Sequence, residues 1–321
     1  GLGDVYKRQI YNHGKLTIFG GTIGTAQGGE GKSSGSGNGG HGIYSKTMEI
    51  LGGIIQKAIG GNANGNTCTG GSGIHSDGTL TISGGEIQQA TGGDSTGISG
   101  KGGTGIRGDQ VVKISGGAIG SAKGGSGDSG GAGIGTGAKP AFATEINISG
   151  GTITEATGGT GGAGIGGGKN SSGETKVNIT GGKVNASTGY GNGGAGIGSG
   201  KESSGVTNIE ITGDALVSAD SSGGAAIGSG ESSTGETTIN IHDTNTGKGV
   251  KSAFAYGGAG IGSGESAKGE THVTIRNASV STLESSDTYT STSGAGIGTG
   301  YASTVSYTPL RAHETLANLV C

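Results

Sequence analysis

EINISGGTITEATGGTGGAGIGGG, residues Glu145–Gly168, is the stretch of sequence that decides the fold. It contains a segment that alternates apolar and polar residues up to Ile148, a second apolar segment around Ile153, and a Gly-rich segment around Ile165. Alternation of this kind is typical of a half-buried β-strand. The Gly-Gly pair between the first two segments is a turn signal, because glycine adopts positive φ without steric cost. The stretch therefore predicts three short strands joined by tight corners.

The same three segments recur nine times between residues 10 and 304. The isoleucine that ends the first segment returns every 30 to 34 residues, and a fixed period of this length indicates a solenoid. Five positions further on, each copy has a second recurring position, which is apolar in every copy but the eighth: Ile23, Ile55, Ile87, Ile119, Ile153, Val184, Leu216, Thr246 and Val280.

This repeat predicts an all-β, single-domain parallel β-helix of about nine coils, each with three short strands and roughly 31 residues. Coils stack about 4.8 Å apart, so isoleucine packs on isoleucine from one coil to the next. We expect a right-handed coil, because β-crossover-β connections are almost always right-handed. The chain has no Trp and only three Phe, which indicates a narrow interior.

The connections between the strands change partway along the chain. In coils 1–3, about residues 10–108, the long Gly/Ser-rich connection lies between the second and third strands. In coils 4–9, about residues 109–304, it lies between the third strand and the next coil, while the total length of the repeat is kept. We therefore expect one domain whose protruding ridge moves to another corner near Asp109.

The two ends of the chain fit no repeat. Residues 1–9, GLGDVYKRQ, and residues 305–321, which begin VSYTPLRAHET, both resemble translated sequencing adapter, and the alternative is a pair of ordinary flexible termini. We exclude both ends from the fold and expect neither to join a coil. The resemblance implies that the end coils lack caps, so we expect end-to-end self-association through unpaired strand edges.

Composition excludes several classes of function. The formal net charge of −3 gives no basic surface for nucleic acid or an anionic membrane. Cys68 and Cys321 form no metal-type pattern, and the loose G-x-G-x-x-G matches lack the strand–loop–helix context of a nucleotide site. We therefore expect no metal, no cofactor, no nucleic-acid partner and no membrane span in this stretch.

Charged residues recur with the repeat and build no obvious catalytic pocket. The histidines lie on different coils with no evident partner pattern: His41, His75, His242 and His272. Stacking predicts two lines of carboxylates on the later ridge, one of Glu174, Glu236 and Glu270, interrupted by Val206, and one of Glu202, Glu231 and Glu265. Such lines could hold a hard cation, but a solvated charged corner is the favoured interpretation.

The outward positions of the first strand form the candidate binding face. Stacking predicts a ladder of amides and hydroxyls at intervals of about 4.8 Å, suited to hydrogen bonding with an extended glycan. The alternative is a face that only keeps the rod soluble. The candidate residues of this ladder are Thr81, Asn147, Asn178, Glu210 and Asn240.

With its GGTIT and GGAGIGGG segments, the chain resembles the Gly-rich β-helix repeats of large surface proteins from gut-type Gram-positive bacteria. The resemblance covers residues 10–304 and implies a secreted or cell-surface protein with a structural or adhesive, non-catalytic role. One alternative is a carbohydrate-binding module attached to a polysaccharide-active enzyme. A less favoured one is a polysaccharide lyase or hydrolase, which would need a cluster of acidic and basic residues. The resemblance is specific for the architecture and carries no functional residue to this chain.

Overall fold

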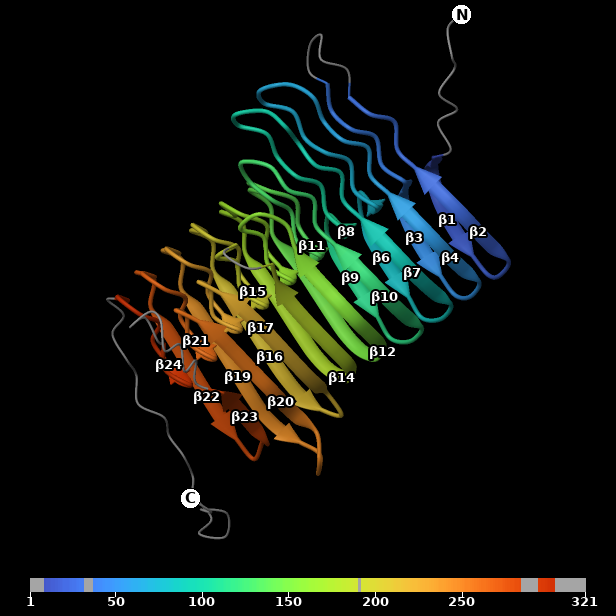
Figure 1. Cartoon of the computed structure of the whole chain (residues 1–321). Coiled ribbons are helices and arrows are strands. Elements are labelled where there is room, and N and C mark those ends of the chain that lie inside the picture. The colour runs from blue at the N-terminus through green and yellow to red at the C-terminus, as the bar shows by residue number, and fades with distance from the viewer. Residues whose placement is uncertain (1–8, 32–36, 190–191, 284–293, 304–321) are drawn as a thin grey trace, which may run out of the picture.

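The computed structural model describes residues 9–31, 37–189, 192–283 and 294–303. These residues form strands and turns, with no helix among them. The coils stack from β1 (Ile10–Ile18) at one end to β24 (Ile297–Gly298) at the other (Figure 1). The predicted parallel β-helix is confirmed, with about eight turns roughly 32 residues apart. The two adapter-like ends lie outside the described residues, apart from Gln9.

Each coil contributes up to three strands to the stack. The first strands are β1, β3 (Ile43–Ile50), β6 (Thr79–Ile82), β9 (Val111–Ile114), β12 (Thr144–Gly158), β14 (Thr175–Thr188), β16 (Thr207–Gly213), β19 (Thr237–Thr244) and β22 (Thr271–Arg276). The second strands are β2 (Thr22–Gln27), β4 (Ile54–Ile59), β7 (Glu86–Thr91), β10 (Ala118–Lys123), the later parts of β12 and β14, β17 (Leu216–Ser222), β20 (Gly249–Tyr256) and β23 (Val280–Leu283). The third strands are the starts of β1 and β3, β5 (Ile74–Ser76), β8 (Ile106–Gly108), β11 (Ile134–Gly135), β13 (Ile165–Gly166), β15 (Ile197–Gly198), β18 (Ile227–Gly228), β21 (Ile261–Gly262) and β24.

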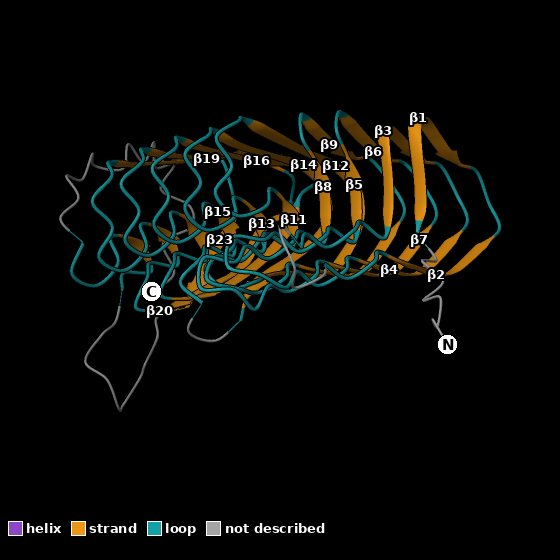
Figure 2. Ribbon diagram, turned by 90° about the horizontal axis from the view of Figure 1, so that it is seen from above, coloured by secondary structure: helices purple, strands orange, loops and turns teal. Residues whose placement is uncertain are grey.

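Rows of isoleucine form the core between these strands. Each first-strand isoleucine pairs in parallel register with the equivalent residue of the next coil, as Ile82 does with Ile114 and Ile148 does with Ile179. These side chains are buried, except for the partly buried Ile275, and branched side chains of one shape fill the same space from coil to coil. Figure 2 shows the first strands along one side of the stack and the second strands along the other.

Two core positions differ from the prediction. Val217, and not Leu216, is the buried partner of Val184, because the corner after β16 holds one more residue than the Gly-Gly corners of earlier coils. In the eighth coil Val250, and not Thr246, continues the same row. The corner is longer still there, and Gly247 has a φ of 76° in it. The prediction failed at both places because it counted a fixed five residues across corners of unequal length.

The change of layout near Asp109 is present in the structure. Only two residues separate β5 from β6 and β8 from β9, so the third strand runs almost directly into the next coil. From β11 onward, eight residues separate each third strand from the following first strand. These loops, residues 136–143 and their four equivalents, form the later ridge.

Candidate functional site

The predicted ladder is a single row in the structure. Thr81 pairs with Lys113, which pairs with Asn147, and the row continues through Asn178 and Glu210. Asn240 is the next residue of the row. Stacking therefore brings all five predicted residues into line, and contact with a glycan stays a prediction.

The amides of this row already bond to one another. Asn178 Nδ2 donates to Asn147 Oδ1 over 2.7 Å, and Asn147 Nδ2 donates to Glu145 Oε1 over 3.1 Å. Glu210 Oε1 lies 3.5 Å from His242 Nε2. These contacts satisfy part of the hydrogen-bonding capacity that a ligand would otherwise use.

The expectation that the histidines lack partners is wrong. His242 and His272 each lie beside carboxylates, and His41 and His75 lie in contact with each other on adjacent coils. The second pair belongs to a polar group at the corner where the third strands enter the next coil. We call this group the corner cluster, and it consists of His41, Tyr44, His75, Asp77, Arg107 and Asp109.

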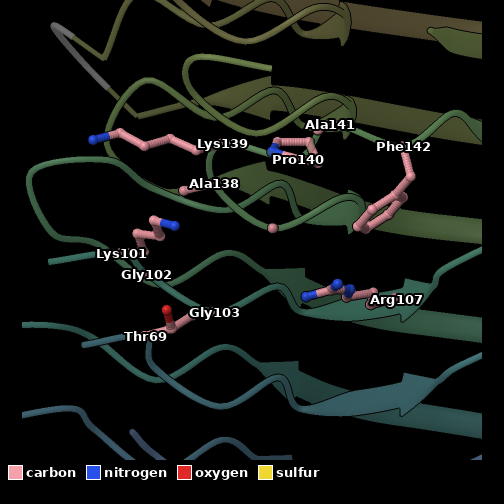
Figure 3. Close-up of a pocket in the computed structure, with 11 residues that line it drawn as sticks. Thr69, Lys101, Gly102, Gly103, Arg107, Ala138, Lys139, Pro140, Ala141 and Phe142 are labelled. Carbon is pink, nitrogen blue, oxygen red and sulfur yellow. The ribbon is translucent and has the colours of Figure 1, made fainter. Parts of the chain in front are cut away.

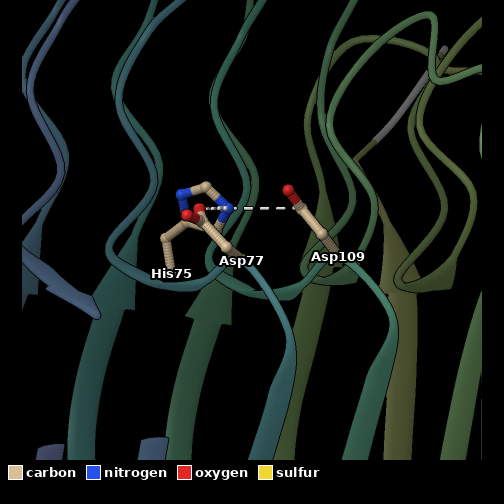
Figure 4. Close-up of side chains that lie close together, drawn as sticks. All are labelled: His75, Asp77 and Asp109. Carbon is tan, nitrogen blue, oxygen red and sulfur yellow. Dashed lines mark hydrogen bonds and ion pairs between the residues drawn. The ribbon is translucent and has the colours of Figure 1, made fainter. Parts of the chain in front are cut away.

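Strand register assembles the corner cluster. Tyr44, His75 and Arg107 each follow a buried third-strand isoleucine and are successive partners, so their side chains share the outward face. Tyr44 also stacks on Tyr11 of the preceding coil, with ring centroids 4.5 Å apart. Asp77 and Asp109 lie in the two-residue corners directly after β5 and β8. The short connection of this region therefore places two carboxylates beside the histidine row (Figure 4).

A chain of hydrogen bonds fixes the tautomers within the cluster. The backbone N–H of Ser72 donates to His41 Nδ1 over 2.9 Å, so that nitrogen carries no proton. His41 Nε2 then carries the proton and donates to His75 Nδ1 over 3.0 Å. His75 Nε2 must in turn be the protonated nitrogen, and it donates to Asp109 Oδ1 over 3.2 Å. This assignment follows from the direction of one obligatory backbone donor.

The same contacts shift the acidities of the cluster. Burial, helped by the nearby charge of Arg107, lowers the pKa of His41 from 6.5 to about 3. Burial alone would raise the pKa of Asp109, but the hydrogen bond from His75 and the charge of Arg107 hold it below its usual value. The hydrogen bond from Tyr44 to Asp77 raises the pKa of the Tyr44 hydroxyl to about 12.

The cluster has the spacing of a metal site but not its protonation. One ligand atom from each of His75, Asp77 and Asp109 lies within 4.8 Å of the others. A metal on His75 Nε2 would move the proton to Nδ1, where it would face the N–H of His41. His41 could not move its own proton from Nε2 to Nδ1, because Nδ1 accepts the hydrogen bond from the N–H of Ser72. The hydrogen-bond chain therefore opposes metal binding at this place.

A basic pocket adjoins the cluster where the ridge changes corner. It has a volume of about 220 Å³ and lies between coil 3 and the loop before β12 (Figure 3). Lys101, Arg107 and Lys139 line it together with Thr69 and the apolar part of residues 137–142. Arg107 belongs to both the pocket and the corner cluster, so the two form one continuous site.

A second hollow, of about 450 Å³, lies on the outward face of the second strands. Its lining is polar, and the burial of Asp220 raises the pKa of that carboxyl group. It spans four successive coils, through Thr154, Glu155, Asn185, Ala186, Ser187, Ser218, Asp220 and Ser252. This polar groove lies on a different face from the predicted ladder.

The carboxylate lines on the later ridge are confirmed in one case and wrong in the other. The first line is aligned as predicted, because the backbone carbonyl of each member accepts from the N–H of the threonine that begins the first strand of the preceding coil. The members of this line are Glu174, Val206, Glu236 and Glu270. In the second line, the residue that aligns with Glu231 is Lys201 and not Glu202. The N–H of Lys201 donates to the carbonyl of Gly161, and the N–H of Glu231 donates to the equivalent carbonyl of Gly193. Lys201 Nζ lies 2.7 Å from Glu231 Oε1. A lysine in this line favours a charged corner over a cation site.

No known protein-family profile, curated protein or solved structure matches this chain. Within the described part of the chain, no helix has the length and apolarity needed to cross a membrane.

Proposed function

We propose that residues 10–304 act as a non-catalytic, rigid structural or adhesive segment of a secreted or cell-surface protein. The observation that supports this most is the unbroken register of the first-strand isoleucines, which pair from Ile18 to Ile275. Each coil buries its apolar face against its neighbours, so a rod of stacked coils resists bending where a flexible linker would not.

Rigidity can be measured between spin labels at the two ends. Tyr11→Cys and Tyr301→Cys place labels at exposed positions, once the native cysteines are replaced by serine. We expect a narrow distance distribution centred on the order of 40 Å, from the spacing of stacked strands. Deleting residues 149–179 removes one register repeat, since Ile148 pairs with Ile179, and should shorten the distance by about 4.8 Å. A broad distribution would refute the rigid rod.

The polar groove favours a second function, that of a carbohydrate-binding module. Its carboxylates, amide and hydroxyls offer both donors and acceptors, and it crosses several coils, as an extended chain of sugars would. The amides of the first-strand ladder are less available, because they bond to each other. We therefore expect any glycan contact on the second-strand face in preference to the ladder of Thr81 and its row.

Pull-down with insoluble polysaccharides separates these two functions. Binding that is lost in Asp220→Ala and kept in Asn178→Ala would support a module that uses the polar groove. Binding lost only in Asn178→Ala would instead support the ladder. No binding by a folded chain would leave the structural rod. Release of unsaturated or reducing sugars from the same substrates would contradict the non-catalytic assignment.

A further inference from the structure

We infer that the basic pocket binds an oxyanion group, such as a carboxylate or a sulfate, through Arg107 and Lys101. The inference does not depend on the rod's proposed role, because it rests on the local chemistry of the pocket alone.

Three cations gather around a volume that holds few opposing charges. Lys139 Nζ lies 3.8 Å from Asp128, a loose pair at the surface. For Lys101, the described residues offer no carboxylate within 4.0 Å, although the chain is acidic as a whole. Cations collected in this way, with one left uncompensated, make the pocket attractive to an anion.

Arg107 is held in place before any ligand arrives. Its Nε donates to Asp109 Oδ1 over 2.5 Å, and its guanidinium carbon lies 5.5 Å from the centre of the Phe142 ring. Asp109 is itself fixed by His75. The corner cluster therefore orients the guanidinium, and the described residues offer Arg107 no ion-pair partner other than Asp109. Its terminal nitrogens can bind an oxyanion through two parallel hydrogen bonds.

A buried hydroxyl lies next to the guanidinium. Thr104 is fully buried, and its Oγ1 has no hydrogen-bond partner in the part of the chain that the structure describes. A Cβ built on Gly137 would meet Arg107 Nη1 at 3.1 Å and Thr104 Oγ1 at 3.7 Å. A methyl group at position 137 would therefore press against Arg107 Nη1, so glycine at this position lets the guanidinium keep its place at the pocket.

The size of the pocket limits the ligand. At about 220 Å³ it is smaller than the usual site for a drug-sized molecule. It has room for an oxyanion carried on a single sugar ring, or for a small free oxyanion. Phe142 and Ala138 give the apolar surface on which a sugar ring could pack.

Isothermal titration calorimetry with three probes tests the inference and separates the two sources. Galacturonic acid carries a carboxylate on a sugar, galactose is its neutral counterpart, and sodium sulfate supplies a free oxyanion. We expect saturable binding of at least one anion and none of galactose. Tighter binding of galacturonic acid than of sulfate would identify a glycan-borne group, and the reverse would identify a free oxyanion.

Four variants locate the binding. Arg107→Gln should weaken it about tenfold or more, and Lys101→Gln about threefold, the losses expected for a charge-assisted hydrogen bond and a more exposed charge. Gly137→Ala should also weaken it, by filling the space beside Arg107. Lys113→Gln makes the same change of charge on the first-strand row and should leave binding within about twofold, as expected for a screened surface charge.

Either of two results would overturn the inference. One is the absence of saturable anion binding by a chain whose thermal unfolding is normal. The other is a loss in Lys113→Gln as large as the loss in Arg107→Gln. If Arg107→Gln lowers the midpoint of thermal unfolding, the binding losses of Lys101→Gln and Gly137→Ala are compared with that of Lys113→Gln instead.

Discussion

The regions before and after β11 share the same buried rows but differ at one outward position. The residue after the third-strand isoleucine, or after its equivalent Ile10, is Tyr11, Tyr44, His75 or Arg107 in the first region. In the second region it is always glycine: Gly135, Gly166, Gly198, Gly228, Gly262 and Gly298.

The path of the chain explains this difference. In the second region the chain turns out of the sheet into the ridge loop, and these glycines have φ between 133° and 143°, where L side chains are strained. A Cβ on Gly198 would also lie 1.9 Å from the carbonyl oxygen of Gly228. In the first region the chain continues as strand, so a side chain fits there. The position of the loop thus decides where the rod can carry reactive side chains.

The largest expected effect comes from adding a methyl group to this glycine row. Gly198→Ala combines a strained φ with a clash against backbone, and we expect it to cost more than about 3 kcal/mol of unfolding free energy. Arg107→Ala changes the equivalent position of the first region and should cost less than half as much. Urea unfolding of both variants makes the comparison, and equal losses would contradict the role given to the loop.

A smaller effect should appear on acidification, and it should come from the first region. The pKa of His41 is about 3 when folded and 6.5 when unfolded, so the unfolded chain takes up the proton first. The stabilisation from this residue is complete above pH 6.5 and is lost as the pH falls toward 3. At pH 5 the loss should be about 1–2 kcal/mol. His41→Phe should flatten this part of the stability profile, and an unchanged slope would show that His41 is not the group responsible.

Ion pairs on the ridge should matter less than those in the corner cluster. Glu231→Gln breaks a partly exposed pair with Lys201 and should cost about 0.5 kcal/mol, most of it removed by added salt. Asp109→Asn disturbs His75 and Arg107 together and should cost about 1–2 kcal/mol. Unfolding at low and high salt compares the two, and a larger loss for Glu231→Gln would reverse the ranking.

The smallest expected effect is that of zinc on the corner cluster. Because the hydrogen-bond chain keeps the proton on His75 Nε2, we expect added Zn²⁺ to leave the unfolding midpoint unchanged. Bound metal at 100 times its Kd would add about 2.7 kcal/mol. A rise of that order that disappears in His75→Gln would show that the tautomers are assigned wrongly.

The architecture was predictable because it repeats. Nine spaced isoleucines define the period, and the change in loop position follows from counting residues between them. Leu216 could not be distinguished from Val217 in the same way, since both are apolar and only the length of the preceding corner decides which one is buried.

The corner cluster left a weaker signal in the sequence. His41, His75 and Asp109 are spaced 34 and 34 residues apart, close to one coil each, which suggests contact across coils. The positions of Tyr44, His75 and Arg107 directly after an isoleucine were also visible in the sequence. What the sequence lacked was the path of the chain through the two-residue corner, which brings Asp109 from the end of one coil to the histidine of another.

The ladder bonds of this fold join one coil to the next, along the length of the stack. Tension between the two ends would therefore break the hydrogen bonds of one coil interface after another, beginning at the ends of the stack. Each coil that detaches would release roughly 110 Å of extended chain in place of about 4.8 Å of rod. A rod of this construction would take up a sudden pull by lengthening in steps, and it could rewind when the pull ends, because each detached coil leaves its neighbour as a template.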